Sequence, residues 1–324
     1  MVSGGGVARH RRLRFVVRGA VLAQGARAAV DEFLIGVLSN IGLMSLLALS
    51  AWLLLVVGEI SFGQQAFFAL GAYAAGIATA LYGWPLPLGL FAGVVVGALA
   101  GFAVAIPTMR LTGLAFAIAT LAFAELMRLL LQLWVFQREV DGERLGPNAV
   151  EGFRGVRWVY DHDLSALGYL GVIWGIVVVV LAALFLCERS RIGLACRAVG
   201  ADAELAEAQG LPAARLKILV ATVAGGLAAL GGGLYVHLAT YVEPQHFSIM
   251  LGVHALAYGL IGGLGTALGP ILGVVLDIGL LEALQEIARY RMIVFGGAVA
   301  VLLILRPRGL LDEALVRRLT RGKP

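Results

Sequence analysis

Charge is scarce in this chain of 324 residues: Asp, Glu, Lys and Arg together make up 14% of it, whereas a soluble domain carries about 25%. Hydrophobic residues make up 60%, and this composition argues against a soluble fold. Several apolar runs reach the length of about 20 residues that crosses roughly 30 Å of hydrocarbon. Barrel strands would alternate apolar and polar residues, so the continuous runs predict an all-α, polytopic integral membrane protein.

Lysine, cysteine and histidine are also scarce. The two lysines, Lys217 and Lys323, do not follow a glycine-rich loop, which excludes ATP hydrolysis by a phosphate-binding loop in this chain. The two cysteines, Cys187 and Cys196, are too few for a disulfide framework. The five histidines show no paired spacing of the HExxH kind, so the sequence predicts no metal site and no cofactor of its own.

The positive charge is concentrated in three places. Arginines gather in the basic N-terminal segment 1–32, in the loop 188–217 and in the tail 311–324. Basic clusters beside membrane spans mark the cytoplasmic side, which explains the net charge of +5 better than nucleic-acid binding does. We therefore expect a membrane domain over 33–310, with a cytoplasmic loop at 188–217 and a cytoplasmic tail.

Apolar blocks and their interruptions predict about eight membrane-embedded segments, some of them broken or re-entrant. A mixed, glycine-containing stretch at 137–168 reads as an extramembrane loop with a short helix. The expected segments are 33–57, 60–82, 88–106, 113–136, 169–187, 216–240, 249–277 followed by the polar-faced stretch 278–290, and 291–305.

Counting these spans gives a conflict of sidedness. If every block crosses once from a cytoplasmic N-terminus, the basic loop lies outside, against the positive-inside rule. Two adjustments remove the conflict: either 60–82 enters and leaves by the same face, or part of 13–30 is embedded. The C-terminus lies inside only if 249–285 crosses twice, with a break between Gly262 and Pro270.

Two groups of polar residues lie within the apolar segments. Glu125 and Arg128 stand on one helix face at i, i+3, and charges within a span face protein or water and pair; they form either a packing ion pair or a polar wall of a substrate path. Ser61, Gln64 and Gln65 serve either interhelical hydrogen bonding or a path.

Other features of the spans have simpler interpretations. Asp277, near a span end, is expected to reach water. Ser61 with His254 is the nearest approach to an intramembrane serine protease, but no full catalytic constellation is present, so no catalytic residue is predicted. Glycines at 93, 97 and 101 have the spacing that lets two helices approach closely. A denser cluster predicts a broken helix, and its members are Gly262, Gly263, Gly265, Gly269 and Pro270.

The polar segment from Ser190 to Lys217 predicts a short helix from about Asp202 to Gln209. Glycine at 210 takes the left-handed position that ends a helix, and Pro212 stops it from continuing. This segment is the longest polar interruption in the second half of the chain. It is a candidate surface for contact with a partner.

Several stretches together resemble the permease subunits of branched-chain amino acid ABC importers, in particular the LivM-like branch. The resemblance runs in order from about residue 35 to 310 and includes Glu125 and Arg128 at matching places. The stretches are GEISFGQQAFFALGAYAAG (58–76), LTGLAFAIATLAFAELMRLLL (111–131), SRIGLACRAVGADAELAEAQGLPAARLK (190–217), GGLYVHLATYVEPQHFS (232–248), GLIGGLGTALGPILG (259–273) and RPRGL (306–310).

The resemblance implies a multi-pass permease of the bacterial cytoplasmic (inner) membrane that imports branched-chain or other hydrophobic amino acids. It implies a second, homologous permease, two ATPase subunits that bind ATP and Mg²⁺, and an extracytoplasmic substrate-binding protein. The residues implied to meet the ATPase are Arg197, Asp202, Glu204, Ala206, Glu207, Ala208 and Gly210.

Two alternatives stay open from the residues alone. An ion-gradient-driven secondary transporter would use the broken helix and the intramembrane charges as its coupling site. A membrane scaffold that does not transport would need no polar path. The sequence does not identify the substrate, because the resemblance implies that selectivity lies largely in the separate binding protein.

Overall fold

The computed structural model describes residues 32–108, 110–140 and 142–280, together with 293, 296, 297, 300, 301, 304 and 310. The N-terminal segment 1–31, the stretch 281–292, most of the expected span 291–305 and the tail 311–324 lie outside the described residues. Five described helices are long and apolar enough to cross a membrane. They are Glu32–Val56, α3 (Leu86–Thr108), α4 (Leu114–Leu133), α6 (Ala166–Arg189) and α9 (Ala213–Ala239).

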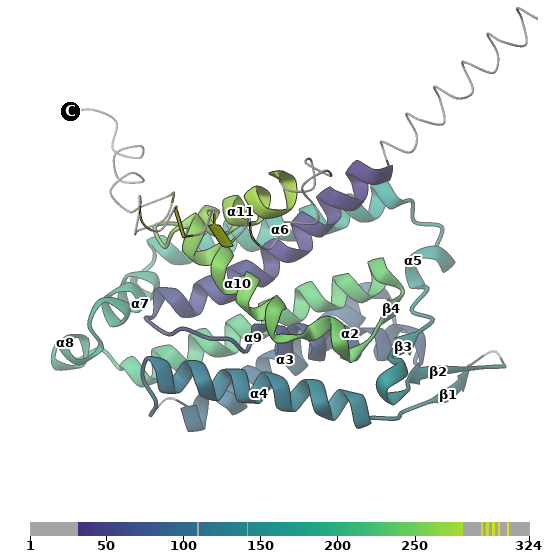
Figure 1. Ribbon diagram of the computed structural model, residues 1–324, viewed down its shortest axis with the longest axis horizontal. Helices are drawn as coiled ribbons and strands as arrows, with labels where there is room; N and C mark the ends of the chain where they lie inside the picture. The colour runs from purple at the N-terminus through teal and green to yellow at the C-terminus, as the bar shows by residue number, and fades with distance from the viewer. Residues whose placement is uncertain are drawn as a thin grey trace, which may run out of the picture.

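The described part of the membrane domain also contains shorter helices: α2 (Gln64–Ala80), α10 (Ile249–Gly262) and α11 (Leu268–Val274). Outside the bundle the chain forms two structured regions, which lie at opposite ends of it (Figure 1). One holds α7 (Arg191–Ala201) and α8 (Ala203–Ala208), and the other holds α5 (Trp158–Asp161) and a small sheet. A polytopic, predominantly helical membrane fold is therefore confirmed.

The small sheet was not predicted. Four short strands pair antiparallel in the order β1 (Arg138–Val140), β2 (Glu143–Pro147), β3 (Phe153–Arg154) and β4 (Tyr241–Val242), with a 3₁₀ turn at Ala149–Glu151 (η1). Strands of two to five residues are too short to show an alternating pattern, and β4 comes from a distant part of the chain. The expected loop 137–168 is thus a folded structure rather than an irregular connection.

The chain crosses the bundle between residues 57 and 83. Gly58 lies against α7, where a Cβ on it would be 3.1 Å from the Gly200 carbonyl oxygen. Gly76, in α2, lies against the sheet, because a Cβ added to Gly76 would be 2.7 Å from Phe153 Cε1 of β3. Because α7 and β3 are at opposite ends (Figure 1), the interpretation that 60–82 enters and leaves by one face is wrong. The other adjustment, an embedded 13–30, lies outside the described residues.

Helices α2, α3 and α9 form the most closely packed part of the bundle. Gly97 and Gly101 of α3 face α9, where added Cβ atoms would stand 2.6 Å from the carbonyl oxygens of Gly225 and Ala221. A methyl group on Gly232 of α9 would overlap the Phe68 carbonyl of α2. Small residues at these positions let the backbones touch, as the glycine spacing predicts.

The last described part of the membrane domain is a helical hairpin. After the 3₁₀ turn Pro244–Phe247 (η2), α10 ends at Gly262, and α11 begins at Leu268 and continues into the π-helical turn Val275–Leu280 (η3). Gly273 of α11 lies against Tyr258 of α10, so the chain turns back on itself. The predicted break is present between the two helices.

Asp277 corrects one expectation. Its side chain is buried and accepts a hydrogen bond of 2.6 Å from the Tyr258 hydroxyl, so it does not reach water. The hairpin folds η3 back beside α10 and the helix Glu32–Val56, where Ile278 packs with Ile41. The sequence predicted a position at a span end, whereas the hairpin brings this carboxylate inside the bundle.

Candidate functional site

The expected short helix in the polar loop is α8, and a second helix, α7, precedes it. Asp202 caps α8: its Oδ1 accepts a hydrogen bond of 2.9 Å from the backbone N–H of Leu205. Gly210 has φ +86°, the left-handed conformation that favours glycine after a helix. Helix α7 was not predicted, although its buried residues Gly193, Cys196 and Val199 lie on one face.

The predicted docking residues divide into an exposed group and an inward-facing group. Glu204, Glu207, Ala208 and Gly210 are exposed on α8 and its end. Ala206 is only 3% exposed and packs with Val199 and Ala213, so it supports α8 from beneath. Exposed leucine at 205, 57% accessible, was missed, although an apolar side chain between two acidic ones is a sequence signal for a contact surface.

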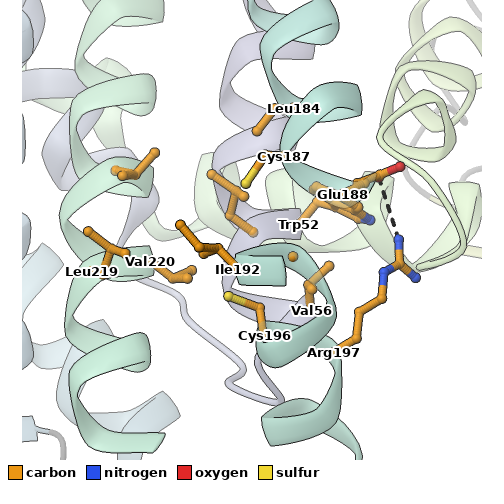
Figure 2. Close-up of a pocket in the computed structure, with 13 residues that line it drawn as sticks. Trp52, Val56, Leu184, Cys187, Glu188, Ile192, Cys196, Arg197, Leu219 and Val220 are labelled. Carbon is orange, nitrogen blue, oxygen red and sulfur yellow. Dashed lines mark ion pairs between the residues drawn. The ribbon is translucent and has the colours of Figure 1, made fainter. Parts of the chain in front are cut away.

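Arg197 also faces inward. Its Nη2 donates to the Gly265 carbonyl oxygen at 3.1 Å and lies 3.6 Å from Glu188 Oε1. Figure 2 shows this pair at the edge of a largely apolar cavity of about 100 Å³, lined by the helix Glu32–Val56, α6, α7 and α9. Both cysteines line this cavity, and burial raises the pKa of the Cys196 thiol.

A second buried ion pair joins the bundle to the polar loop. Lys217 Nζ, at the start of α9, lies 2.6 Å from Oε1 of Glu59, whose side chain is 4% exposed. The pair connects the segment that precedes α2 to α9, the helix that follows α8. Sequence reasoning missed Glu59, although a carboxylate directly after an apolar span needs a partner when it is buried.

Ser61, Gln64 and Gln65 gather where α2 begins, and all three are at most 2% exposed. Ser61 Oγ accepts from the Gly63 N–H at 3.2 Å. Neither side-chain amide of Gln64 or Gln65 has a hydrogen-bond partner among the described residues. Leaving such a group unsatisfied costs about 1–3 kcal/mol of folding free energy. A buried polar group without a partner therefore needs an explanation, and a functional role is one.

Gln65 lies against the hairpin. A methyl group on Gly252 of α10 would overlap Gln65 Oε1. Nearby, Thr120 of α4 accepts a hydrogen bond of 3.1 Å from the Phe62 N–H. The beginning of α2 is therefore surrounded by α4 on one side and α10 on another, inside the bundle.

Glu125 and Arg128 form the predicted ion pair on α4, with Nε 2.9 Å from Oε2. Their side chains are 34% and 21% exposed, in contrast to the fully buried glutamines. The two predicted path groups therefore differ in burial. A partly exposed pair on one face of α4 is compatible with both interpretations, the packing ion pair and the polar wall of a path.

The histidines have local partners. His237 Nε2 lies 2.9 Å from Thr79 Oγ1, which links α9 to α2. His254 Nδ1 lies 2.8 Å from the Met250 carbonyl oxygen on its own helix. Among the described residues, no group of three or more His, Cys, Asp or Glu side chains could hold a metal ion.

An aromatic cavity of about 550 Å³ opens near the sheet between α2, α3 and the end of α4. Tyr73, 2% exposed, lines it, and its hydroxyl has no hydrogen-bond partner among the described residues. The rings of Tyr82, Trp84 and Trp134 stand at its rim. Aromatic side chains with a polar tip are common at the membrane–water interface, which fits this end of the bundle.

Comparison with known proteins gives the following similarities. The chain is 29% identical over 320 residues to the high-affinity branched-chain amino acid transport system permease protein LivM of Salmonella typhimurium, covering 90% of this chain and 71% of that protein. It is 29% identical to Escherichia coli LivM, covering 78% and 64%. It is also 25% identical to the permease protein LivH of Escherichia coli, covering 81% and 89%.

No solved structure matches the chain. The three relatives are all named as transport-system permeases, and none of these names points to an ion-gradient-driven transporter or to an enzyme. Residues 33–305 match the family described as "Branched-chain amino acid transport system / permease component". The chain therefore belongs to this family of multi-pass membrane transport permeases.

Proposed function

We propose that this chain is a permease subunit of an ATP-driven importer of branched-chain or other hydrophobic amino acids in the bacterial cytoplasmic (inner) membrane. The observation that carries the proposal is the exposed, ordered helix pair α7–α8 at one end of the bundle. The absence of a phosphate-loop motif in the sequence means that an ATPase must be supplied by another subunit, and this surface is suited to receive one.

The docking surface consists of the exposed residues Glu204, Leu205, Glu207 and Ala208 with Gly210. Two carboxylates around a leucine suit a partner that offers an apolar pocket rimmed by basic groups. Asp202 caps α8, and Ala206 packs against Val199 and Ala213, so both residues hold α8 in place. Arginines at 189, 191 and 215 are exposed around it, which supports a cytoplasmic position by the positive-inside rule.

The opposite end, with the sheet and α5, would then face the extracytoplasmic binding protein. A second, homologous permease would complete the path, and two ATPase subunits would bind ATP and Mg²⁺ beneath the pair. The similarity to both LivM and LivH supports a pair of related permeases. Within this chain we place the path at Ser61, Gln64 and Gln65, because unpaired buried amides have hydrogen bonds to offer a passing polar solute.

The test is co-purification and uptake with the partner subunits present. Charge reversal by Glu207→Arg should leave membrane insertion intact, reduce recovery of the ATPase and lower amino acid uptake. Glu139→Arg, an exposed charge reversal on β1 at the other end, is the matched control for ATPase recovery, which it should leave at the level of the parent protein. Equal ATPase recovery in the two variants would contradict docking at α8.

A further inference from the structure

Two consecutive helices, α6 and α7, meet a distant part of the chain through two charged side chains. Glu188 ends α6, Arg197 lies in the middle of α7, and the residues around Gly265 form the break between α10 and α11. Arg197 donates to the carbonyl oxygens of Gly265 at 3.1 Å and Leu264 at 3.5 Å. Glu188 Oε1 accepts from the Ala267 N–H at 2.8 Å.

The contacts have complementary electrostatics. Backbone groups at helix ends lack partners within their helix, and a carboxylate is stabilised at a helix N-terminus. Ala267 is the residue before α11, so Glu188 stands at the N-terminal end of that helix. Arg197 meets loop carbonyls that follow α10, and it is 3.6 Å from Glu188, which joins the two halves into one cluster.

This cluster contacts the hairpin at the turn between α10 and α11. Gly263 has φ +93°, and a methyl group on Gly262 would overlap the Gly269 carbonyl, so the turn is tight. Figure 2 shows Arg197 extending from α7 away from the cavity and toward the neighbouring ribbon. Arg197 therefore links α7 to the break, and through the break to α10.

Helix α7 has room to shift on one side. The cavity of about 100 Å³ separates part of α7, including Ile192 and Cys196, from Leu219 and Val223 of α9. On its other side α7 touches the helix Glu32–Val56 by backbone, because a methyl group on Gly200 would overlap the Val56 carbonyl. Beside the cavity, Cys196 of α7 packs with Val220 of α9 in one apolar cluster, so the room to shift is limited to the side of Ile192.

We propose that Glu188 and Arg197 are positioning residues that couple the docking helices to the α10–α11 break, so that movement of α7 and α8 moves the hairpin beside Gln65. The inference rests on the proposed function and adds the route by which the motor subunit acts on the path. Neither residue needs to touch the transported solute or the ATPase. Their effect is on the number of solute molecules moved per ATP hydrolysed.

The experiment uses the complete transporter, reconstituted with its partner subunits in proteoliposomes, and measures leucine uptake and ATP hydrolysis in the same vesicles. Glu188→Gln keeps an acceptor for the Ala267 N–H and removes the charge, and Arg197→Gln removes the contacts to the break. Each should lower uptake per ATP by about tenfold, within the range of known coupling effects, while the ATPase stays bound. The double variant should be no worse than either single one, since both act in one cluster.

Two comparisons separate coupling from folding. Arg191→Gln, an exposed change on the same helix, should leave the ratio of uptake to hydrolysis unchanged, and Arg197→Lys should restore part of it. Spin labels at Leu194 and Leu264, both exposed, report the α7-to-break distance directly. That distance should stay constant between the nucleotide-free and ATP-bound states and should vary in Arg197→Gln.

Each outcome decides a different claim. An unchanged ratio in both Glu188→Gln and Arg197→Gln overturns the coupling role, as does a label distance that varies in the unmodified cluster. Loss of the ATPase from the unmodified chain, or normal uptake without any ATPase, instead overturns the proposed function. A drop in the ratio with the ATPase still bound supports both.

Discussion

The α2–α3–α9 unit and the α10–α11 hairpin are both rich in glycine and use it in different ways. In the unit, glycines bring backbones into contact along three continuous helices, and the contacts repeat over several turns. In the hairpin, glycines interrupt the helix, and side chains of α6 and α7 hold the break from outside. The hairpin also has close backbone contacts, at Gly262 with Gly269 and at Gly273 with Tyr258. The difference is that the residues between α10 and α11 are held by side chains of other helices, and we expect this segment to be the part that rearranges.

The largest expected effect comes from separating the helix backbones of the α2–α3–α9 unit. Gly232→Ala places a methyl group into the Phe68 carbonyl and 3.1 Å from the Ala72 nitrogen. Overpacking at a backbone contact has no flexible side chain to yield, so we expect a loss of about 3 kcal/mol of folding free energy or more, read as a large fall in melting temperature in detergent. Gly175→Ala in α6, with nothing within 4 Å, should melt no lower than the parent.

The next prediction concerns the break itself. Gly263→Ala forces a Cβ onto a backbone with φ +93° and ψ 156°, a region that is essentially restricted to glycine, at a cost of about 1–3 kcal/mol, no more than that of Gly232→Ala. Gly113, at the turn before α4, has φ +57° and free space around it, so Gly113→Ala carries comparable backbone strain. If the break is the moving part, uptake by the reconstituted transporter falls about tenfold in Gly263→Ala and stays near normal in Gly113→Ala. Equal uptake in the two variants would show that the break is a fixed turn.

The sequence predicted the helical membrane fold because long apolar runs have one stable arrangement in lipid. It also located the break at Gly262 and the helix end at Gly210, since each depends on local backbone chemistry. It missed the sheet, in which Phe153 of β3 pairs with Val242 of β4, a strand from a distant part of the chain. Such pairing depends on the tertiary fold and leaves no local pattern.

The site shows the same division. The acidic face of α8 could be predicted because its residues are neighbours in sequence. The inward direction of Arg197 and the pair Glu59–Lys217 could not, because their partners are about 68 and 158 positions away. The two path groups looked equivalent in sequence, since both are polar residues in apolar helices. Their exposure separates them.

A smaller expected effect on folding tests that difference in burial where the α2–α3–α9 unit meets the hairpin. Gln64→Leu removes an unpaired buried amide, so stability in detergent should stay equal or rise by about 1 kcal/mol. Leucine uptake should nevertheless fall strongly, because the amide is then missing from the path. A matched change in α4, Gln132→Leu, alters a half-buried glutamine away from this point and should leave uptake unchanged.

The ion pair on α4 completes the comparison. Glu125→Gln breaks an i, i+3 pair worth about 0.5 kcal/mol or less, since both side chains are partly exposed. As a packing pair it should lose that small stability and a correspondingly small part of uptake, in step. Should Glu125→Gln abolish uptake at unchanged stability while Gln64→Leu transports normally, the path runs along α4, and the α2–α10 junction is only a costly packing contact.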